Sequence, residues 1–126
     1  MQTRTIRFYP AAEVNEEKIE GTIAAVVDVL RATSTIITAL GSGCRAVIPV
    51  MDVEKAHDVS NSFRQQDVVL GGERKGQKID GFDFGNSPQE YTRERIQGKV
   101  LVITTTNGTK ALVGAAKAAR TVVLSF

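Results

Sequence analysis

The sequence TIAAVVDVLRATSTIITALGSG, residues 22–43, decides the fold class, because an apolar run passes directly into a helical pattern. Residues 22–27 form an unbroken, largely apolar run with β-branched side chains, which is typical of a strand buried on both faces of a parallel sheet. The run ends at Asp28. From Ala32 to Leu40 the apolar residues follow helical spacing, and glycines at 41 and 43 end the helix. A buried strand followed at once by a helix predicts an α/β fold.

The same alternation continues along the chain. Further strands are expected at residues 45–50, 67–70, 99–104 and 121–124, and helices at 53–63 after an Asp52 cap, at 88–96 after an N-cap at Ser87, and at 107–119. Strands that alternate with helices predict a mostly parallel sheet with helices on both faces, in a three-layer α/β/α arrangement. Because the chain stops inside the last strand, we expect this single domain, residues 1–126, to be incomplete at its C-terminus.

Composition restricts the function classes. The chain has 126 residues, of which 42% are apolar and 24% charged, with 11 Gly and 3 Pro, and this excludes a disordered or low-complexity protein. Sixteen basic against fourteen acidic residues give a net charge of +2, which does not favour a nucleic-acid partner. A lone cysteine, Cys44, and the lack of a long apolar segment predict a cytoplasmic protein without a membrane partner. Cys44 is expected to pack in the interior, and His57 to lie on the surface.

The segment DVLRATST, residues 28–35, joins a buried strand to a helix. An anion could bind to the free amides of the helix start and to the hydroxyls of Thr33, Ser34 and Thr35. The Arg31 guanidinium could bind a phosphate or sulfonate through two parallel N–H groups. Asp28 could hold a cation or attack phosphorus. The alternative is that Asp28 and the hydroxyls only satisfy the turn and cap the helix.

The segment TTTNGT, residues 104–109, occupies an equivalent strand-to-helix junction. We call these two strand-to-helix junctions, residues 28–35 and 104–109, the first and the second elbow. The second elbow would lie beside the first, and its residues Thr106, Asn107, Gly108 and Thr109 would complete a substrate-binding cradle. The alternative is a capped helix with a tight Asn107–Gly108 turn.

Between these elbows, GGERKGQKIDGFDFGNS, residues 71–87, is expected to be a long irregular loop, because it holds five glycines and both signs of charge. Its basic groups could bind an acidic substrate, while Glu73 or Asp83 could hold Mg²⁺, which prefers carboxylate oxygens. The alternative is a solvated loop with offsetting charges. Ligands of parallel α/β sheets bind beyond the carboxyl ends of the strands, and there the three segments should converge.

These three segments also carry a family resemblance. VVDVLRATSTI (residues 26–36), LGGERKGQKIDGFDFGNSPQEYT (70–92) and TTTNGTKAL (104–112) resemble, in this order, the 2-phosphosulfolactate phosphatase family, named ComB in coenzyme M biosynthesis. The resemblance implies a Mg²⁺-dependent hydrolysis of 2-phosphosulfolactate, a small phosphorylated and sulfonated organic acid, to sulfolactate and phosphate. Because members of that family are close to twice this length, it also implies the N-terminal portion of a longer domain.

The resulting hypothesis assigns roles within the three segments. Asp28, with Glu73 or Asp83, would hold Mg²⁺, and Arg31 and Arg74 would neutralise charge in the transition state. An alternative makes Asp28 a phospho-accepting nucleophile. The substrate-binding set is Thr33, Ser34, Thr35, Lys75, Lys78, Asn86, Thr106, Asn107, Gly108 and Thr109, in which Lys75 and Lys78 would select the sulfonate and carboxylate. Competing readings are a non-catalytic anion-binding domain and a module that forms homo-oligomers through an open sheet edge.

Overall fold

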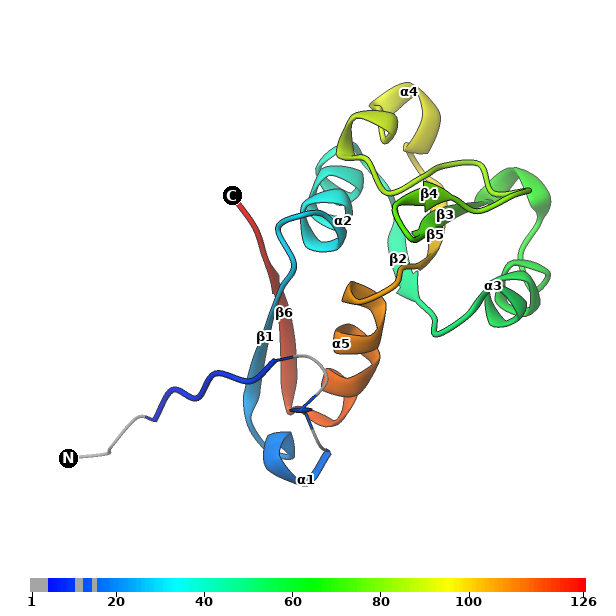
Figure 1. Ribbon diagram of the computed structural model, residues 1–126. Helices are drawn as coiled ribbons and strands as arrows, with labels where there is room; N and C mark the ends of the chain where they lie inside the picture. Colours follow the sequence, from blue (N-terminus) through cyan, green and yellow to red (C-terminus); the bar gives the residue numbers. More distant parts are fainter. Residues whose placement is uncertain (1–4, 11–12, 15) are drawn as a thin grey trace.

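Helices and strands alternate along the chain in the computed structural model, which describes residues 5–10, 13–14 and 16–126 (Figure 1). The α-helices are α1 (Glu16–Ile19), α2 (Ala32–Gly41), α3 (Val53–Ser60), α4 (Arg93–Ile96) and α5 (Gly108–Gly114). The strands are β1 (Ile23–Val27), β2 (Ala46–Pro49), β3 (Val68–Arg74), β4 (Gln77–Lys78), β5 (Val100–Thr104) and β6 (Arg120–Leu124). The expected α/β class is confirmed.

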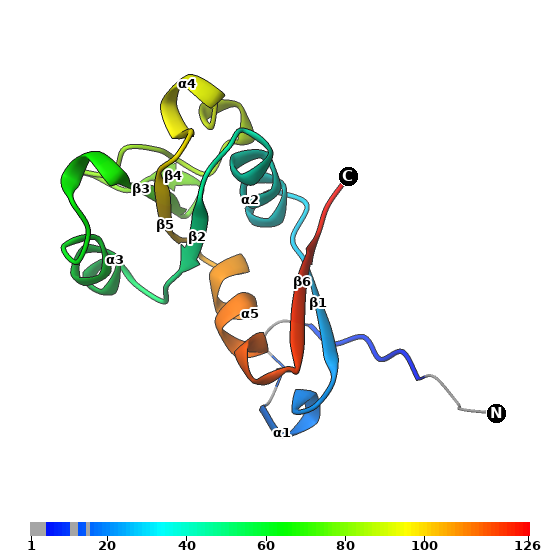
Figure 2. The same ribbon diagram turned by 180° about the vertical axis from the view of Figure 1, so that it is seen from behind.

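The strands pair in two sheets. One has the order β2–β5–β3–β4, with β5 parallel to both β2 and β3, and β4 antiparallel to β3. The other consists of the parallel pair β1 and β6. Figures 1 and 2 show α2 and α5 beside both sheets, in agreement with the contacts that each of these helices makes. The sheet is therefore mostly parallel, as expected, but it is divided.

Strand β5 is the centre of the larger sheet, and all five of its residues are buried. Leu101 and Ile103 pack with Ile36 of α2 and Ile96 of α4 in one core cluster. Val102, whose side chain points to the opposite face, packs in a second cluster that includes Ala56 of α3 and Phe82. Around β5 the expected arrangement of helices on both faces is thus present.

Strand β1 is exposed where the sequence predicts full burial. Ile23 and Val27 are 73% and 60% exposed, and Val26 alone is buried. The expectation fails because β1 pairs with β6 alone in the described part of the chain, and Ile23 and Val27 line an open groove that residues 5–10 border but do not fill. An apolar run shows that a strand can be buried, but whether it is buried depends on which elements pack against it.

Strand β3 continues to Arg74, although a loop was predicted from residue 71. Gly71 and Gly72 are strand residues that pair with β5. Glycine is needed at both positions because a Cβ on Gly71 would collide with the Tyr91 hydroxyl, and one on Gly72 with the Thr104 carbonyl oxygen. A two-residue turn then leads into β4, with positive φ at Lys75 (52°) and Gly76 (80°), as in a type I′ hairpin. Half of the predicted irregular loop is therefore a hairpin.

Other boundaries differ in smaller ways. The Asp52 cap is confirmed, since the Asp52 carboxylate accepts a 2.7 Å hydrogen bond from the Lys55 amide. The helix predicted at 88–96 is divided into a 3₁₀ turn, Pro88–Glu90, and α4, because Tyr91 leaves helical geometry to donate a hydrogen bond to the Gly85 carbonyl. The helix predicted at 107–119 ends at Gly114 and continues as the 3₁₀ turn Ala115–Lys117.

Two single residues lie where they were expected. His57 is exposed and meets the edge of the Phe82 ring. Cys44 is buried, its thiol donates to the carbonyls of Ala46 and Lys99, and burial raises its pKa. Within the described residues, the helices are too short or too polar to cross a bilayer.

Candidate active site

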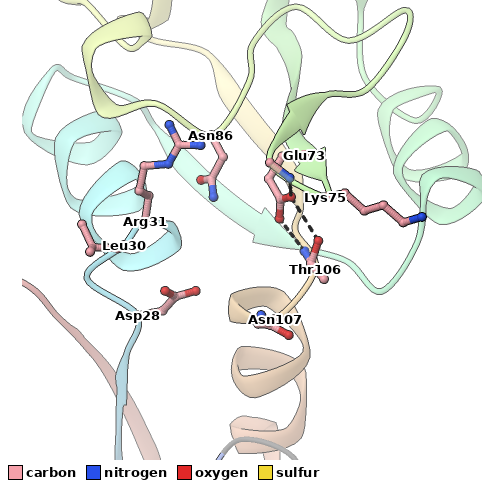
Figure 3. A pocket seen from close by; sticks show the side chains of 9 residues that line it. Asp28, Leu30, Arg31, Glu73, Lys75, Asn86, Thr106 and Asn107 are labelled. Atoms are coloured by element: carbon pink, nitrogen blue, oxygen red, sulfur yellow. Dashed lines mark hydrogen bonds between the residues drawn. The ribbon is translucent and has the colours of Figure 1, made fainter.

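A cleft of about 280 Å³ lies where strands β1, β3 and β5 end (Figure 3). It brings the three predicted segments together, as parallel strands do at their carboxyl ends. Its lining residues are Asp28, Leu30, Arg31, Glu73, Lys75, Gly76, Asn86, Thr106 and Asn107. Seven of these belong to the site predicted from the sequence, and Leu30 and Gly76 were missed.

Asp28 directly follows β1, and its carboxylate is free of hydrogen bonds from the described residues. Its backbone amide donates a 3.0 Å hydrogen bond to the Thr33 hydroxyl, which fixes the turn between β1 and α2. Gly108 at the start of α5 comes so close that a Cβ there would lie 2.8 Å from Asp28 Oδ2. The half-buried carboxylate thus faces the cleft, with its lone pairs available to a ligand.

Glu73, in contrast, is tightly held. It is 7% exposed, and its Oε1 accepts a 2.7 Å hydrogen bond from the Thr106 amide. Its Oε2 accepts from the Thr106 hydroxyl at 3.0 Å and from the Gly76 amide at 2.8 Å. Burial alone would raise the pKa of Glu73, but these hydrogen bonds and the nearby Arg74 charge outweigh burial and lower the pKa. The carboxylate is therefore ionised at neutral pH.

The hydroxyls of the first elbow are used inside the protein. Thr35 donates to the Asn86 carbonyl at 3.1 Å, and Ser34 donates to the Val29 carbonyl and pairs with Ser125. Thr33 and Thr35 are fully buried, and none of the three hydroxyl residues lines the cleft. Thr33 and Ser34 thus satisfy the turn before α2, as in the alternative hypothesis, Thr35 holds the Asn86 segment, and no side chain among the described residues caps the helix start.

The second elbow repeats this device. The Thr105 amide donates a 3.0 Å hydrogen bond to the Thr109 hydroxyl, just as the Asp28 amide does to Thr33. Thr109 is fully buried and lies outside the cleft, whereas Thr106 and Asn107 line it. At both strand-to-helix junctions, a backbone amide just after the strand is thus bonded to the hydroxyl of a threonine in the helix.

Three charged residues of the predicted site lie elsewhere. The Arg74 guanidinium donates to the hydroxyl of Thr104 at 2.8 Å, and Asp83 Oδ2 accepts a 2.8 Å hydrogen bond from the Leu70 amide. Lys78 is exposed on β4. None of the three lines the cleft, and of the hairpin only Glu73, Lys75 and Gly76 do so.

A comparison with known proteins bears on this cleft. The family model described as 2-phosphosulpholactate phosphatase matches residues 8–126. The chain belongs to the 2-phosphosulfolactate phosphatase family. A relative from Clostridium acetobutylicum, named as a probable 2-phosphosulfolactate phosphatase, is 53% identical over 104 residues, covering 82% of this chain and 44% of the relative. Relatives of the same name from Clostridium novyi and Clostridium perfringens are each 51% identical, over 86% and 89% of the chain and 46% of their own length. The chain thus spans less than half the length of these curated relatives.

For a member of a phosphatase family, the donor set of the cleft fits Mg²⁺. This ion is commonly bound through one or two carboxylates, several waters and substrate phosphate, rather than by a full protein cage. Asp28 and Glu73 supply two carboxylates to the same cleft. Asp83, which was predicted as a metal ligand in place of Glu73, lies outside the cleft, and the described residues contain no cluster of three or more acidic, His or Cys side chains.

Proposed function

We propose that this protein is a Mg²⁺-dependent phosphatase that hydrolyses 2-phosphosulfolactate to 3-sulfolactate and phosphate, a reaction of sulfolactate metabolism and of coenzyme M biosynthesis. The observation that carries the proposal is the meeting of Asp28, Glu73 and Arg31 in one cleft, in a chain of this family. Two carboxylates match a metal-assisted reaction of a phosphate monoester, and a guanidinium suits the binding of an oxyanion of the substrate. The single cysteine, which is a free thiol, supports a cytoplasmic location.

Asp28 and Glu73 would hold Mg²⁺, which when bound neutralises charge on the phosphoryl oxygens. Glu73 contributes a carboxylate that is fixed by three hydrogen bonds and stays ionised, so that little reorganisation is needed on binding. Asp28 contributes a carboxylate with unused lone pairs. In the reaction, water adds to phosphorus, the ester P–O bond breaks, and the released oxygen takes up a proton to become the hydroxyl of sulfolactate.

The two arginines have different places in this proposal. Arg31 lines the cleft, and its guanidinium makes no hydrogen bond to the described residues, so it can pair with a substrate oxyanion through two parallel N–H groups. Arg74 lies outside the cleft and ties β3 to β5 through Thr104. We therefore give Arg74 a positioning role: it holds the strand end that carries Glu73 and helps to keep this carboxylate ionised.

The experiment is phosphate release from 2-phosphosulfolactate, measured with Mg²⁺ and with a chelator. Release should require the metal, and Asp28→Asn should lower it at least a hundredfold, while the matched change Asp58→Asn, at an exposed site on α3, should not. Near-normal Mg²⁺-dependent turnover by Asp28→Asn would exclude both roles considered for Asp28. If folded wild-type protein binds the substrate without releasing phosphate, the anion-binding alternative holds.

A further inference from the structure

Asn86 is a buried polar residue whose side chain has no hydrogen bond to the described residues. It lines the cleft, only 7% of it is exposed, and its amide oxygen Oδ1 is buried without a partner. Buried amide groups are almost always hydrogen-bonded in native proteins, because the loss of hydration is otherwise not compensated. An unpaired amide in the wall of a cleft therefore points to a ligand.

The position of this amide is fixed from outside the cleft. The Asn86 carbonyl accepts from the Thr35 hydroxyl at 3.1 Å, and the preceding residue, Gly85, is held at both of its backbone groups. The Gly85 amide donates to Glu90 at 3.0 Å, and its carbonyl accepts from the Tyr91 hydroxyl at 2.6 Å. Three hydrogen bonds thus hold the backbone of Gly85 and Asn86, one of them at Asn86 itself, whereas the Asn86 side chain in the cleft has no hydrogen bond to the described residues.

Arg31 can supply the hydrogen-bond donor that the Asn86 side chain lacks. Figure 3 shows the guanidinium of Arg31 pointing toward Asn86 from the start of α2. A guanidinium has five N–H donors and no acceptor, and the Asn86 Oδ1 is an acceptor without a donor. The unused groups of the two side chains can therefore satisfy each other, and the remaining N–H groups of both are left for an anion.

Two other residues of the same cleft carry negative charge. Asp28 and Glu73 are carboxylates, and an anion can bind against them only with a cation between. The wall of Asn86 and Arg31 can bind an oxyanion directly. A substrate with two kinds of anionic group would accordingly place the phosphoryl group at the carboxylates and the other group at Asn86 and Arg31.

We propose that Asn86 and Arg31 form the recognition site for the anionic group of the substrate that is not transferred, a carboxylate or a sulfonate. When the ligand is bound, Oδ1 of Asn86 accepts from the guanidinium and orients it, while Asn86 Nδ2 and the free guanidinium N–H groups donate to the ligand. This inference rests on the proposed function for the identity of its ligand, and it gives the recognition of the acid to a pair of cleft residues in place of Lys75 and Lys78.

The first test separates a ligand-binding role from a structural one. Asn86→Leu has nearly the same shape and removes an amide that makes no hydrogen bond within the protein. We expect the unfolding temperature of the free protein to stay the same or rise, and its affinity for 3-sulfolactate, measured by calorimetry, to fall at least tenfold. A marked fall in unfolding temperature with intact affinity would overturn the proposal.

The second test measures the coupling of the pair. Arg31→Met, Asn86→Leu and the double variant are titrated with 3-sulfolactate, and Arg93→Met, at an exposed position of α4, controls for the lost charge. The double variant should bind more weakly than Arg31→Met alone but less weakly than the product of the two single losses, because Asn86 acts partly through the guanidinium and partly through its own Nδ2. Fully multiplicative losses would refute the orienting role.

Single-acid probes identify the bound group. L-lactate carries only the carboxylate and isethionate only the sulfonate, and the probe whose affinity depends on Asn86 names the group at this wall. If the affinities for both probes and for 3-sulfolactate are the same in wild type and Asn86→Leu, the inference is overturned even if phosphate release is confirmed. Conversely, Asn86-dependent binding of 3-sulfolactate without any phosphate release would refute only the proposed reaction.

Discussion

The Glu73 carboxylate accepts a 2.7 Å hydrogen bond from the Thr106 amide, and this contact joins the hairpin after β3 to the elbow after β5. Thr106 donates a second hydrogen bond through its hydroxyl. A side chain that was expected only to bind metal is thus also the link between two walls of the cleft, so changes at Glu73 should alter both stability and binding.

Glu73→Gln should destabilise the protein by about 1–3 kcal/mol, because both carboxylate oxygens accept from backbone amides and the glutamine amide nitrogen cannot accept in place of one of them. The pKa of Glu73 is lowered on folding, so its stabilising contribution is present above the pKa of the unfolded chain and is lost as the pH falls through the folded value. The difference in unfolding free energy between wild type and variant should therefore shrink in acid. Glu94→Gln, on the exposed side of α4, should show no such pH dependence.

Gly108→Ala should disturb the start of α5 and the position of Asp28. The new Cβ would collide with Ala32 Cβ and approach Asp28 Oδ2 to 2.8 Å, and overpacking of this kind costs about 1–3 kcal/mol. Gly114→Ala in the same helix is the control, since nothing lies within 4 Å of its Cβ and alanine favours a helix. Denaturant titration should show a loss for the first variant and a small gain for the second; equal effects would contradict the close packing at Gly108.

Tyr91→Phe should weaken the support of the Asn86 segment. The Tyr91 hydroxyl is the donor to the Gly85 carbonyl, and its loss leaves a buried acceptor unpaired at a cost of about 1–3 kcal/mol. Tyr91→Leu also removes the ring that packs on Phe84 and should cost more. If Tyr91→Phe unfolds at the wild-type denaturant concentration, the hydroxyl does not hold this segment.

Lys75→Asn tests the lysine that the sequence pattern assigned to substrate selection. Lys75 has a positive φ of 52°, which asparagine tolerates, so the hairpin should keep its stability. Figure 3 shows the Lys75 side chain pointing away from the cleft centre, and we expect the affinity for 3-sulfolactate to fall far less than in Arg31→Met. Equal losses in the two variants would restore Lys75 as the selecting residue.

The fold could be predicted to the extent that it depends on local pattern. The alternation of apolar runs with helical spacing located β1, α2, β5 and the Asp52 cap, because each of these is set by neighbours in sequence. Gly71 and Gly72 misled the prediction, since a glycine that is needed for a turn and one that is needed beside Tyr91 or Thr104 look the same in a sequence. The separate pairing of β1 with β6 depends on contacts between residues about a hundred positions apart.

The site was predictable at the level of segments and less so at the level of atoms. Topology brings together the strand ends and the connecting loop where the site residues lie: Glu73 is the last residue but one of β3, Asn86 lies on the loop, and Asp28, Arg31, Thr106 and Asn107 follow β1 or β5. Thr33, Thr35 and Asp83 carry suitable groups, but each of these groups is hydrogen-bonded to a backbone amide or carbonyl of the protein. Whether a polar group serves the fold or a ligand depends on its partner, and the partner is not visible in sequence.

The separate pairing of β1 has a dynamic consequence. Asp28 lies at the end of a strand with one neighbour and an exposed face, whereas Glu73 belongs to the sheet built around fully buried β5. The amides of β1 should exchange with solvent deuterium through local opening well before those of β5, which should exchange only on global unfolding. A ligand that bridges Asp28 and Glu73 would then slow exchange mainly in β1. It would join the less stable β1 to the more stable sheet around β5, so that the two open together.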